Sequence, residues 1–447
     1  MMSGIFKKYD IRGIYPKEIN EEIFYELGKA IGTFFGTNKT IVVARDVRLS
    51  SKSLKFNLVR GLVEVGVNVI DVDLVSTPTF HFLVNYFGAD GGAIVTASHN
   101  PPEYNGMKLC RDNLVPIGLG NGLEKIEEIF RTKRYSASSR SGSVRQIENP
   151  SLPHLDFLLK RVPKISKTVR IVADLGNGSA CEFFKNLIKG IKDIECILLN
   201  DEFDGSFPNR LPEPKEENIF ELINEVKNVN ADFGIAFDGD SDRIVFVDDK
   251  GRILPGDWIL AIFAKYLLPN SENKKVVGEI TCTSMIKKIV NELGGEYIES
   301  VVGRRFIIER MRENDCFLGG EVSSHFYFRD TSYVDDSYYA FIKMLNIISN
   351  NDKKLSQIID ETGFPLKTRF SLHAETDEEK NKIIEKVKSK FLKYPCDEKD
   401  GIKVFIDEST WFVARPSNTE PIVKFVAESN EKRKLESIKK SILEILK

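Results

Sequence analysis

The sequence predicts an α/β protein with three similar α/β domains, whose sheets are mixed but mostly parallel, and a smaller C-terminal α+β domain. Three observations support this prediction. The chain has 447 residues, more than a single hydrophobic core usually organises. Short apolar segments alternate with amphipathic ones over most of its length, as strands alternate with helices in parallel sheets. After about residue 366 this alternation gives way to closely spaced strands and two charged helical segments.

The first hundred residues show the alternation most clearly. Asn20 precedes a segment with apolar residues at helical spacing, Ser50 is placed to cap a second helix, and Pro78 suits the first turn of a third. Apolar strands are expected between these helices, at residues 40–44, 68–72 and 92–96. Ligands of parallel sheets bind beyond the carboxyl ends of the strands. The segment TASHN, at residues 96–100, lies at such an end.

Two further alternations follow a polar connection. Residues 135–145 (YSASSRSGSVR) are rich in Ser, Arg and Gly, so we expect an exposed linker there. The second alternation has strands at 169–174, 196–200 and 233–237 and helices at 183–187 and 218–229. The third has helices at 258–267, 284–293, 306–311 and 332–348 and strands at 276–280 and near 297.

The C-terminal part has a different pattern. Strands are expected at 368–372, 404–406, 411–414 and 422–427, and helices at 377–391 and 431–446. We therefore predict four domains, at residues 1–149, 150–250, 251–366 and 367–447.

Composition and charge exclude several classes of function. The formal net charge is −2, so no overall positive field favours nucleic acid or an acidic membrane surface. The six cysteines are scattered without a CxxC pair, which indicates reduced thiols and no disulfide framework. The N-terminal segment lacks the apolar core of a signal peptide, and no apolar run reaches membrane-spanning length. These observations predict a cytoplasmic protein that binds neither nucleic acid nor membrane, and they leave the oligomeric state open.

Three aspartates at alternate positions, Asp238, Asp240 and Asp242, directly follow the apolar segment FGIAF. Turned inward in one tight loop, three carboxylates require a cation, because burying their charges uncompensated is costly. Hard oxygen ligands suit Mg²⁺, which keeps coordination positions open for water or a phosphate oxygen. Arg243 would neutralise excess charge or hold a phosphate. An EF-hand calcium loop is rejected because its sixth position needs Gly, and the buried-looking flanking strands disfavour a solvated acidic turn.

The segment TASHNPPEYNGMK, at residues 96–108, places Ser98 at a strand end beside His99 and near Lys108. A serine nucleophile needs a base or a charge-stabilised product. Phosphoryl transfer depends mainly on positioning and on positive charge around the moving group, which a magnesium ion, Lys108 and Arg243 would supply. Taken alone, the segment is also compatible with a polar turn. No G-x-S-x-G motif surrounds Ser98, so a hydrolase triad is not indicated.

Two later segments have the composition of ligand-binding loops. In LGGEVSSHFY, at residues 318–327, Glu321 and Ser323 point to the same side if the segment is extended, and can grip two neighbouring sugar hydroxyls. His325 would add a donor or a proton shuttle. In RPSNT, at residues 415–419, Arg415 together with backbone amides and hydroxyls of the turn makes an anion cradle.

Taken together and in this order, the segments resemble the motifs of the α-D-phosphohexomutase family, most closely its phosphomannomutase/phosphoglucomutase branch. YDIRG, at residues 9–13, resembles the N-terminal motif of that branch, TASHNPPEYNG its phosphoserine loop and DGDSDR its metal loop. GEVSSH resembles the sugar-specificity loop and RPSNTEP the phosphate-binding loop. The resemblance covers almost the whole chain and implies four domains around a central cleft, each contributing one loop.

The resemblance also implies a role for each candidate site residue. Mg²⁺ is expected to be held by Asp238, Asp240, Asp242 and an oxygen of phosphorylated Ser98. The residues expected to contact the O3 and O4 hydroxyls of the sugar are Glu321 and Ser323. The phosphate that does not react is expected to be clamped by Arg415, Ser417, Asn418 and Thr419. The residues expected to face the transferring group are Arg12, Lys108 and Arg243, with Tyr9 lining the cleft beside Arg12.

The reaction implied by the resemblance moves a phosphate between C1 and C6 of a hexose. Phosphorylated Ser98 donates its phosphoryl group to a hexose phosphate, a hexose 1,6-bisphosphate forms and turns over, and the other phosphate returns to the serine. The implied substrates are mannose and glucose phosphates, and a trace of bisphosphate is expected to act as activator because it restores phosphorylated serine.

Two positions depart from the family pattern. Ser324 stands where the sugar loop usually has Gly, and an added side chain restricts the backbone there. Val301 stands where many relatives have a basic residue, while Arg304 and Arg305 follow Gly303 instead.

Three alternative functions remain open at this point. The nearest is a phosphoglucosamine mutase, against which Asn418 argues because those relatives more often have Ser-Gly-Thr in the phosphate loop. A metal-dependent phosphatase would hydrolyse the same phosphoserine, and a sugar-phosphate sensor would bind without turnover.

Overall fold

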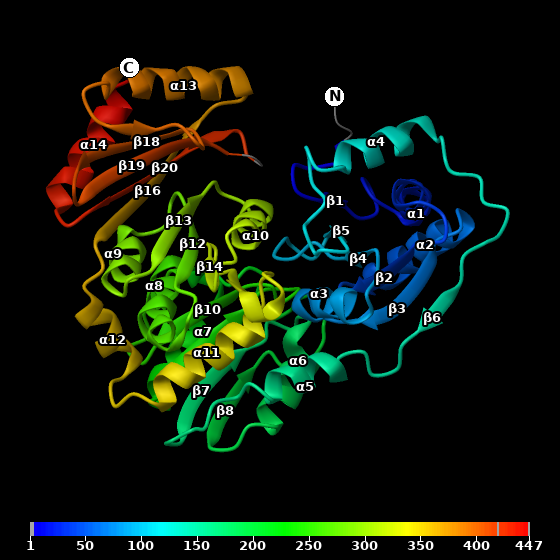
Figure 1. Cartoon of the computed structure of the whole chain (residues 1–447), viewed down its shortest axis with the longest axis horizontal. Helices are drawn as coiled ribbons and strands as arrows, with labels where there is room; N and C mark the ends of the chain where they lie inside the picture. The colour runs from blue at the N-terminus through cyan, green and yellow to red at the C-terminus, as the bar shows by residue number, and fades with distance from the viewer. Residues whose placement is uncertain (1–3, 418–419, 446–447) are drawn as a thin grey trace. The chain divides into compact units, whose positions relative to one another are not determined.

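The computed structural model describes residues 4–417 and 420–445, which form two compact units. The first unit comprises Met1–Pro255 and Ser323–Gln357, and the second comprises Gly256–Val322 and Ile358–Lys447. Figure 1 follows the chain through both by colour. Within the described residues, no helix combines the length and apolar character needed to cross a membrane.

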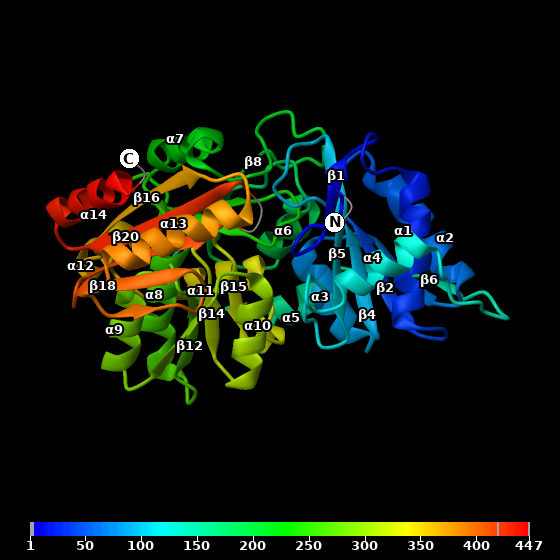
Figure 2. The ribbon, with the colours of Figure 1, turned by 90° about the horizontal axis from the view of Figure 1, so that it is seen from above.

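The first unit begins with a six-stranded sheet in the order β1-β5-β4-β2-β3-β6. Strand β5 runs antiparallel to both of its neighbours, whereas β4, β2, β3 and β6 are parallel. The strands are β1 Ile11–Ile14, β2 Thr40–Arg45, β3 Asn68–Leu74, β4 Gly91–Val95, β5 Tyr104–Arg111 and β6 Val144–Gln146. One face is covered by α1 (Glu21–Phe35), α2 (Ser51–Glu64) and α4 (Leu123–Thr132), and the other by α3 (Thr77–Tyr86) (Figure 2).

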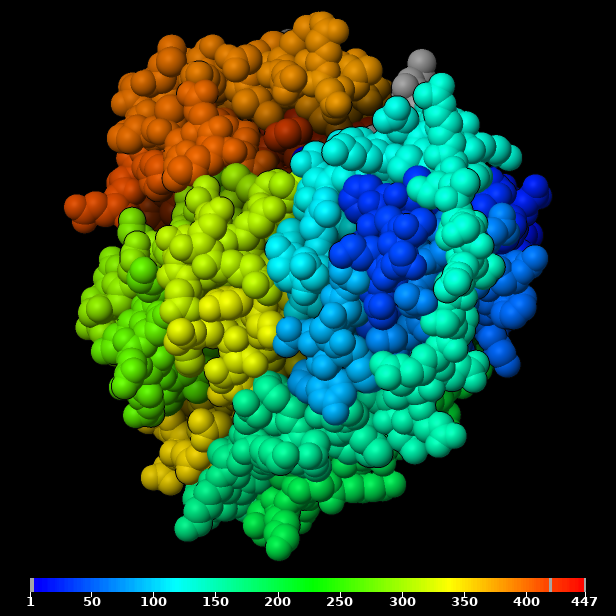
Figure 3. All heavy atoms as spheres, turned by 45° about the vertical axis from the view of Figure 1, so that its right-hand side comes forward, coloured from blue at the N-terminus to red at the C-terminus, as the bar shows by residue number. Residues whose placement is uncertain are grey.

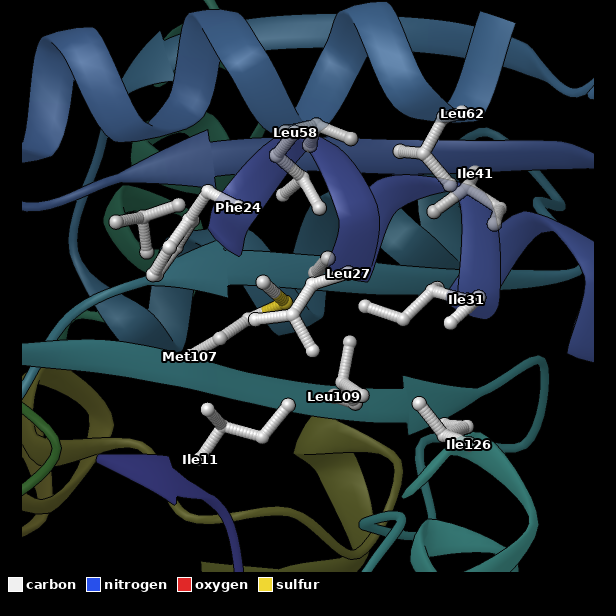
Figure 4. Close-up of a cluster of buried hydrophobic side chains, with 14 of the residues drawn as sticks. Ile11, Phe24, Leu27, Ile31, Ile41, Leu58, Leu62, Met107, Leu109 and Ile126 are labelled. Carbon is white, nitrogen blue, oxygen red and sulfur yellow. The ribbon is translucent and has the colours of Figure 1, made fainter. Parts of the chain in front are cut away.

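The core of this sheet lies under α1 and α2, where Figure 4 shows side chains from both helices meeting those of the strands. Leu27 of α1 and Met107 of β5 are fully buried there. The two helices approach closely because Gly28 faces Gly61. A Cβ atom added at Gly28 would lie 2.3 Å from the carbonyl oxygen of Leu58, so only glycine allows this packing.

A second sheet of the first unit has the strand order β11-β10-β9-β7-β8. Its strands are β7 Val169–Asp174, β8 Ile194–Leu199, β9 Phe233–Phe237, β10 Ile244–Asp248 and β11 Ile253–Leu254. The helices of this part are α5 Leu152–Leu159, α6 Ala180–Lys189, α7 Phe220–Asn228 and α11 Ser337–Ser349. Strand β15 (Phe326–Phe328) also lies in the first unit but does not belong to this sheet. Because β9 and β10 pair antiparallel, the aspartate segment 238–243 is the turn between them.

In the second unit, β12 (Lys275–Glu279) pairs in parallel with β13 (Glu296–Ser300) and β14 (Leu318–Gly320). The helices of this part are α8 Gly256–Leu267, α9 Ser284–Glu292, α10 Arg304–Glu313 and α12 Leu355–Thr362. The C-terminal sheet has the order β16-β20-β19-β18-β17, with the strands Leu366–His373, Ile422–Ser429, Thr410–Pro416, Ile402–Asp407 and Cys396–Asp397. Helices α13 (Asp377–Lys390) and α14 (Lys432–Glu444) pack on one face of it.

The structure confirms the α/β class, the mixed sheets and the C-terminal α+β part, and it adds elements that were not expected. Residues 133–143 form a mostly exposed connection that runs over the surface in Figure 3. The connection leads directly into β6, which pairs in parallel with β3. The polar composition of 135–145 concealed this edge strand. The four domain boundaries stay a prediction, because contacts divide the chain into two units.

Two local expectations were wrong, and one conformational condition was not met. Ser50 does not cap α2, because its backbone is helical and its hydroxyl accepts a hydrogen bond from Asn105 at 2.8 Å. The helix expected from residue 332 begins at Ser337, because Ser332 has a φ of +61° and Asp336 provides the cap. The segment with Glu321 and Ser323 is a turn, not an extended strand, as the φ of +70° at Ser324 requires.

Candidate active site

Ser98 lies in the loop that follows the carboxyl end of β4, as expected for a site residue of a parallel sheet. Its φ is +51°, an uncommon value for a residue other than glycine. Its side chain is buried, and its hydroxyl donates a hydrogen bond to Asp238 Oδ2 at 2.9 Å. The loop therefore directs the serine toward the aspartate segment of the second sheet.

A buried arginine, Arg48, holds this loop in its unusual conformation. The Arg48 side chain is 1% exposed, and its Nε donates to Asp46 Oδ2 at 3.2 Å. Its two terminal nitrogens donate four hydrogen bonds of 2.6–2.9 Å to backbone carbonyls of the serine loop and the start of β5, those of Ser98, Asn100, Pro101 and Tyr104. Buried carbonyl groups need hydrogen-bond donors, and this single side chain supplies donors to four carbonyl groups of the turn.

The three aspartates converge in the turn between β9 and β10. Asp238, Asp240 and Asp242 are all buried, and one carboxylate oxygen of each lies within 4.8 Å of the others. Burial, together with the charges of Asp242 and Asp240, raises the pKa of Asp238 to about 7. Three buried carboxylates this close together are stable as anions only beside strong positive charge.

Part of that positive charge comes from Lys108 of β5. Its ammonium lies 2.6 Å from Asp240 Oδ2 and 2.6 Å from Asp242 Oδ2. Thr77, at the start of α3, donates a further hydrogen bond to Asp240 Oδ2 at 2.6 Å. Asp240 Oδ1, by contrast, has no hydrogen-bond partner among the described residues, although it is buried. A divalent cation fits this donor set, since it would satisfy that oxygen and offset the remaining negative charge.

Other predicted residues surround Ser98. Arg12 of β1 pairs with Asp10 at 2.8 Å, donates to the Ala97 carbonyl at 2.9 Å and contacts Asn100. His99 Nδ1 lies 3.3 Å from Ser98 Oγ. Burial lowers the pKa of His99 far below its usual value, and the charges of nearby arginine and lysine side chains add to the effect. His99 is therefore neutral.

Arg243 closes the aspartate turn. Its backbone N–H donates to Asp238 Oδ1 at 3.2 Å, and its guanidinium lies 4.0 Å from Glu213 Oε1. The ammonium of Lys8 lies 5.7 Å from the ring centre of Tyr9, the remaining predicted residue of the N-terminal motif.

His325 belongs to the first unit and adjoins the aspartates. Its Nε2 lies 3.3 Å from Asp242 Oδ1, and its Nδ1 lies 2.9 Å from the hydroxyl of Ser323. Asp335 completes a compact group with Asp242 and His325, in which one possible ligand atom of each lies within 4.8 Å of the others. Asp335 was not among the residues predicted from the sequence. Its only signal was the pair of aspartates in front of α11, which reads as a helix cap.

The second unit carries the remaining predicted residues. Glu321 follows β14 and is buried. Arg415, at the end of β19, is buried as well, and its Nε donates to Asp400 Oδ2 at 3.0 Å. The Ser417 backbone N–H donates to the Ile422 carbonyl at 2.9 Å, and its own carbonyl accepts from Lys380 at 3.2 Å. Asn418 and Thr419 lie outside the described residues.

The structure thus brings Ser98, the three aspartates and Lys108 into one contact network, with His325 beside it. It also places residues there that the sequence analysis did not select, namely Arg48, Thr77 and Asp335. A serine with an uncommon backbone conformation lies here next to buried carboxylates and an ammonium, the kinds of group that metal-assisted phosphoryl transfer uses.

Comparison with known proteins supports this class. Family models described as phosphoglucomutase/phosphomannomutase match residues 3–137 (alpha/beta/alpha domain I), 153–251 (domain II), 255–363 (domain III) and 373–445 (C-terminal domain). The phosphomannomutase of Methanocaldococcus jannaschii is 35% identical, with 99% of this chain and 98% of that protein covered. The phosphoglucomutase/phosphomannomutase of Thermococcus kodakarensis is 33% identical, with 97% of this chain and 96% of that protein covered.

A solved structure agrees. The crystal structure of a phosphoglucomutase/phosphomannomutase family protein from Burkholderia thailandensis matches with a TM-score of 0.90 and 30% identity, over 100% of this chain and 98% of that one. The chain therefore belongs to the phosphoglucomutase/phosphomannomutase family, the α-D-phosphohexomutases.

Proposed function

We propose that the protein is a hexose phosphate mutase that interconverts hexose 1-phosphates and hexose 6-phosphates through a phosphoryl group carried on Ser98. One observation carries the assignment of the serine. Its hydroxyl is held by Asp238, while Lys108 pairs with Asp240 and Asp242. A phosphoryl group on this oxygen would meet the positive charge that phosphoryl transfer requires.

The chain's own side chains perform the positioning. Asp238 Oδ2 orients the serine hydroxyl and accepts its hydrogen bond, and Arg48 keeps the loop in place through the carbonyls. In the transfer, the bond between phosphorus and Ser98 Oγ breaks while a bond to a hexose hydroxyl oxygen forms. The proton of that hydroxyl passes to a base, for which His325 is the candidate beside the aspartates. The reverse transfer restores phosphorylated Ser98.

Mg²⁺ is the metal that we assign to Asp238, Asp240, Asp242 and the phosphorylated serine, because all of them offer hard oxygen ligands. A bound divalent ion would act as a Lewis acid that neutralises charge on the phosphoryl oxygens. Lys108, Arg12 and Arg243 supply positive charge from the protein side.

We assign substrate recognition to residues of several elements. Glu321 and Ser323 would contact the sugar hydroxyls, with Tyr9 beside Arg12 at the reacting end. Arg415, Ser417, Asn418 and Thr419 would hold the phosphate that does not react. Mannose and glucose phosphates are the proposed substrates, and a hexose 1,6-bisphosphate is the proposed activator, since relatives named phosphomannomutase and phosphoglucomutase cover nearly the whole chain.

A coupled mutase assay tests this proposal. Glucose 1-phosphate, mannose 1-phosphate and glucosamine 1-phosphate are compared with Mg²⁺ and a trace of hexose 1,6-bisphosphate. Turnover of glucose and mannose with poor use of glucosamine is expected. Preference for glucosamine would instead indicate a phosphoglucosamine mutase, and release of free phosphate would indicate a phosphatase.

A further inference from the structure

Two buried carboxyl groups stand side by side at the carboxyl end of the sheet in the second unit. Strands β12 and β14 are parallel, with Gly278 opposite Gly320. The next residue along the chain is a glutamate in both cases: Glu279 is the last residue of β12, and Glu321 directly follows β14. Their relative exposures are only 5% and 4%. Glu321 is a proposed sugar ligand, whereas nothing so far assigns a role to Glu279.

Glu279 is held in a defined orientation toward the sugar loop. Its Oε1 accepts a hydrogen bond from the Thr281 hydroxyl at 2.6 Å and a longer one, 3.4 Å, from the backbone N–H of Val322. Val322 directly follows Glu321. The Glu279 carboxyl therefore connects the end of β12, through a hydrogen bond, to the residue that follows Glu321.

Charged and titratable groups from several elements surround Glu279. Glu321, from the loop after β14, raises the pKa of Glu279, and Arg415, from β19, lowers it. The ammonium groups of Lys403 and Lys367 are bound to the backbone beyond Glu279, where they donate to the carbonyls of Ile280 at 3.0 Å and Thr281 at 2.7 Å. Tyr297 of β13 and Cys282, which precedes α9, also face it, and burial raises the pKa of both well above the usual values. They are therefore neutral at ordinary pH. Burial, followed by the charge of Glu321, raises the pKa of Glu279 to about 7.

Arg415 has one unsatisfied group in this part of the structure. Its Nε is paired with Asp400, but its Nη2 is buried and has no hydrogen-bond partner among the described residues. A phosphate oxygen would satisfy it. If Glu279 and Glu321 were both ionised, two negative charges would face this arginine and oppose the approach of an anionic ligand.

We propose that Glu279 is a positioning residue for the loop that carries Glu321, and that Glu279 fulfils this role in its protonated form. Above neutral pH, hexose phosphate binding is therefore accompanied by uptake of a proton at the Glu279 carboxyl. The neutral carboxyl still accepts from Val322 through Oε1, and it no longer adds a negative charge to that of Glu321. Ligand and proton then promote each other's binding, since the two effects are linked and reciprocal. This inference rests on the proposed hexose phosphate mutase function.

The test compares wild type with Glu279→Gln, in which an amide replaces the neutral carboxyl. KM for glucose 1-phosphate is measured from pH 6 to pH 8.5. The wild-type KM is expected to rise by about tenfold per pH unit at most above the pKa of Glu279, whereas the KM of Glu279→Gln stays lower at high pH. At pH 6 the two KM values should agree. The phosphate of the ligand titrates in both proteins, so only their difference reports Glu279.

A binding measurement separates this inference from the proposed function. Glucose 1-phosphate is titrated calorimetrically at pH 8 into Ser98→Ala protein with and without Glu279→Gln, in two buffers of different ionisation enthalpy. Proton uptake should be larger with Glu279. Equal uptake, or an identical pH dependence of KM, would overturn the inference, whereas absence of turnover in wild type would count against the mutase function alone.

Two further variants guard against misinterpretation. Glu279→Asp keeps a titratable carboxyl but shortens its reach, so it should retain proton uptake while KM is raised at every pH. Glu296→Gln changes an exposed carboxylate at the first residue of β13. This variant should show the same pH dependence of KM as wild type. Loss of the wild-type pH dependence in Glu296→Gln would contradict a role specific to Glu279.

Discussion

The two units each bury a group of carboxylates, but they compensate the negative charge in different ways. In the first unit, Lys108 lies 2.6 Å from two of the three aspartates, and the Thr77 hydroxyl donates to Asp240. The three carboxylates together offer oxygen ligands for a metal ion. In the second, Glu279 is held by one hydroxyl and one backbone N–H, and Nη2 of Arg415 has no hydrogen-bond partner within the described part of the chain. In the proposed transfer site around Ser98 and the aspartates, the protein itself supplies compensating positive charge. In the proposed recognition site around Glu279, Glu321 and Arg415, we expect the ligand to complete the charge balance.

The transfer site depends on a single oxygen, which gives the largest expected effect. Ser98→Ala should lower turnover by about 10⁴-fold or more, because the phosphoryl carrier is lost. The coupled mutase assay measures this, and thermal unfolding checks that the fold is retained. Substantial turnover in a clean preparation would show that another residue carries the phosphoryl group.

The aspartate group should respond next. Asp240→Asn removes one charge from the carboxylate that Lys108 and Thr77 contact, and metal affinity should fall by more than the roughly 10–100-fold typical of outer-sphere changes. Turnover is titrated with Mg²⁺ for both proteins. Wild-type activity that persists in excess chelator would contradict a metal-dependent transfer site.

The third effect concerns Arg48, which holds the loop that carries Ser98. Arg48→Lys reduces five donors to three, so at least two of the five acceptors lose a partner, and the free energy of unfolding should fall by about 2–5 kcal/mol. Turnover should fall while KM changes little, because the loop positions Ser98. Denaturant unfolding and steady-state kinetics test the two parts separately, and an unchanged kcat would refute the positioning role.

The recognition site should behave in the opposite way. Arg415→Lys keeps the charge but loses the planar donor set, so KM should rise by about tenfold while kcat changes little. A matched comparison with Arg48→Lys sharpens the contrast, since both are buried arginines with one carboxylate partner. A fall in kcat without a change in KM for Arg415→Lys would remove the proposed distinction between the two sites.

The smallest effect concerns stability. The pKa of Glu279 is raised to about 7, above that of an unfolded glutamate, so the folded state binds more protons. Its contribution favours folding at low pH and is lost as pH rises from about 4.5 to 7. Glu279→Gln should therefore become more stable relative to wild type at pH 8 than at pH 5, by about 1 kcal/mol or more. An equal difference in the free energy of unfolding between the two proteins at pH 5 and at pH 8 would contradict the raised pKa of Glu279.

Local patterns predicted the fold class and most strands and helices. Asn20 caps α1 as expected, accepting a hydrogen bond from the Ile23 N–H, and Pro78 lies in the first turn of α3. The aspartate turn and the serine loop follow β9 and β4, because polar residues directly after apolar strands mark their carboxyl ends. The cap predicted at Ser50 was wrong, since a capping serine and one that binds a distant asparagine look alike in sequence.

By itself, the sequence determined where the reactive groups lie along the chain, because strand ends, turns and helix starts depend on neighbouring residues. Only the tertiary structure decided which of them meet. Lys108 reaches Asp240 across 132 residues, and Arg48 reaches the Ser98 carbonyl across 50. The pairing of Glu279 with Glu321 needs the register of β12 against β14. Such contacts arise from packing and burial, where a charge is stable only beside a partner, and no local pattern records that partner.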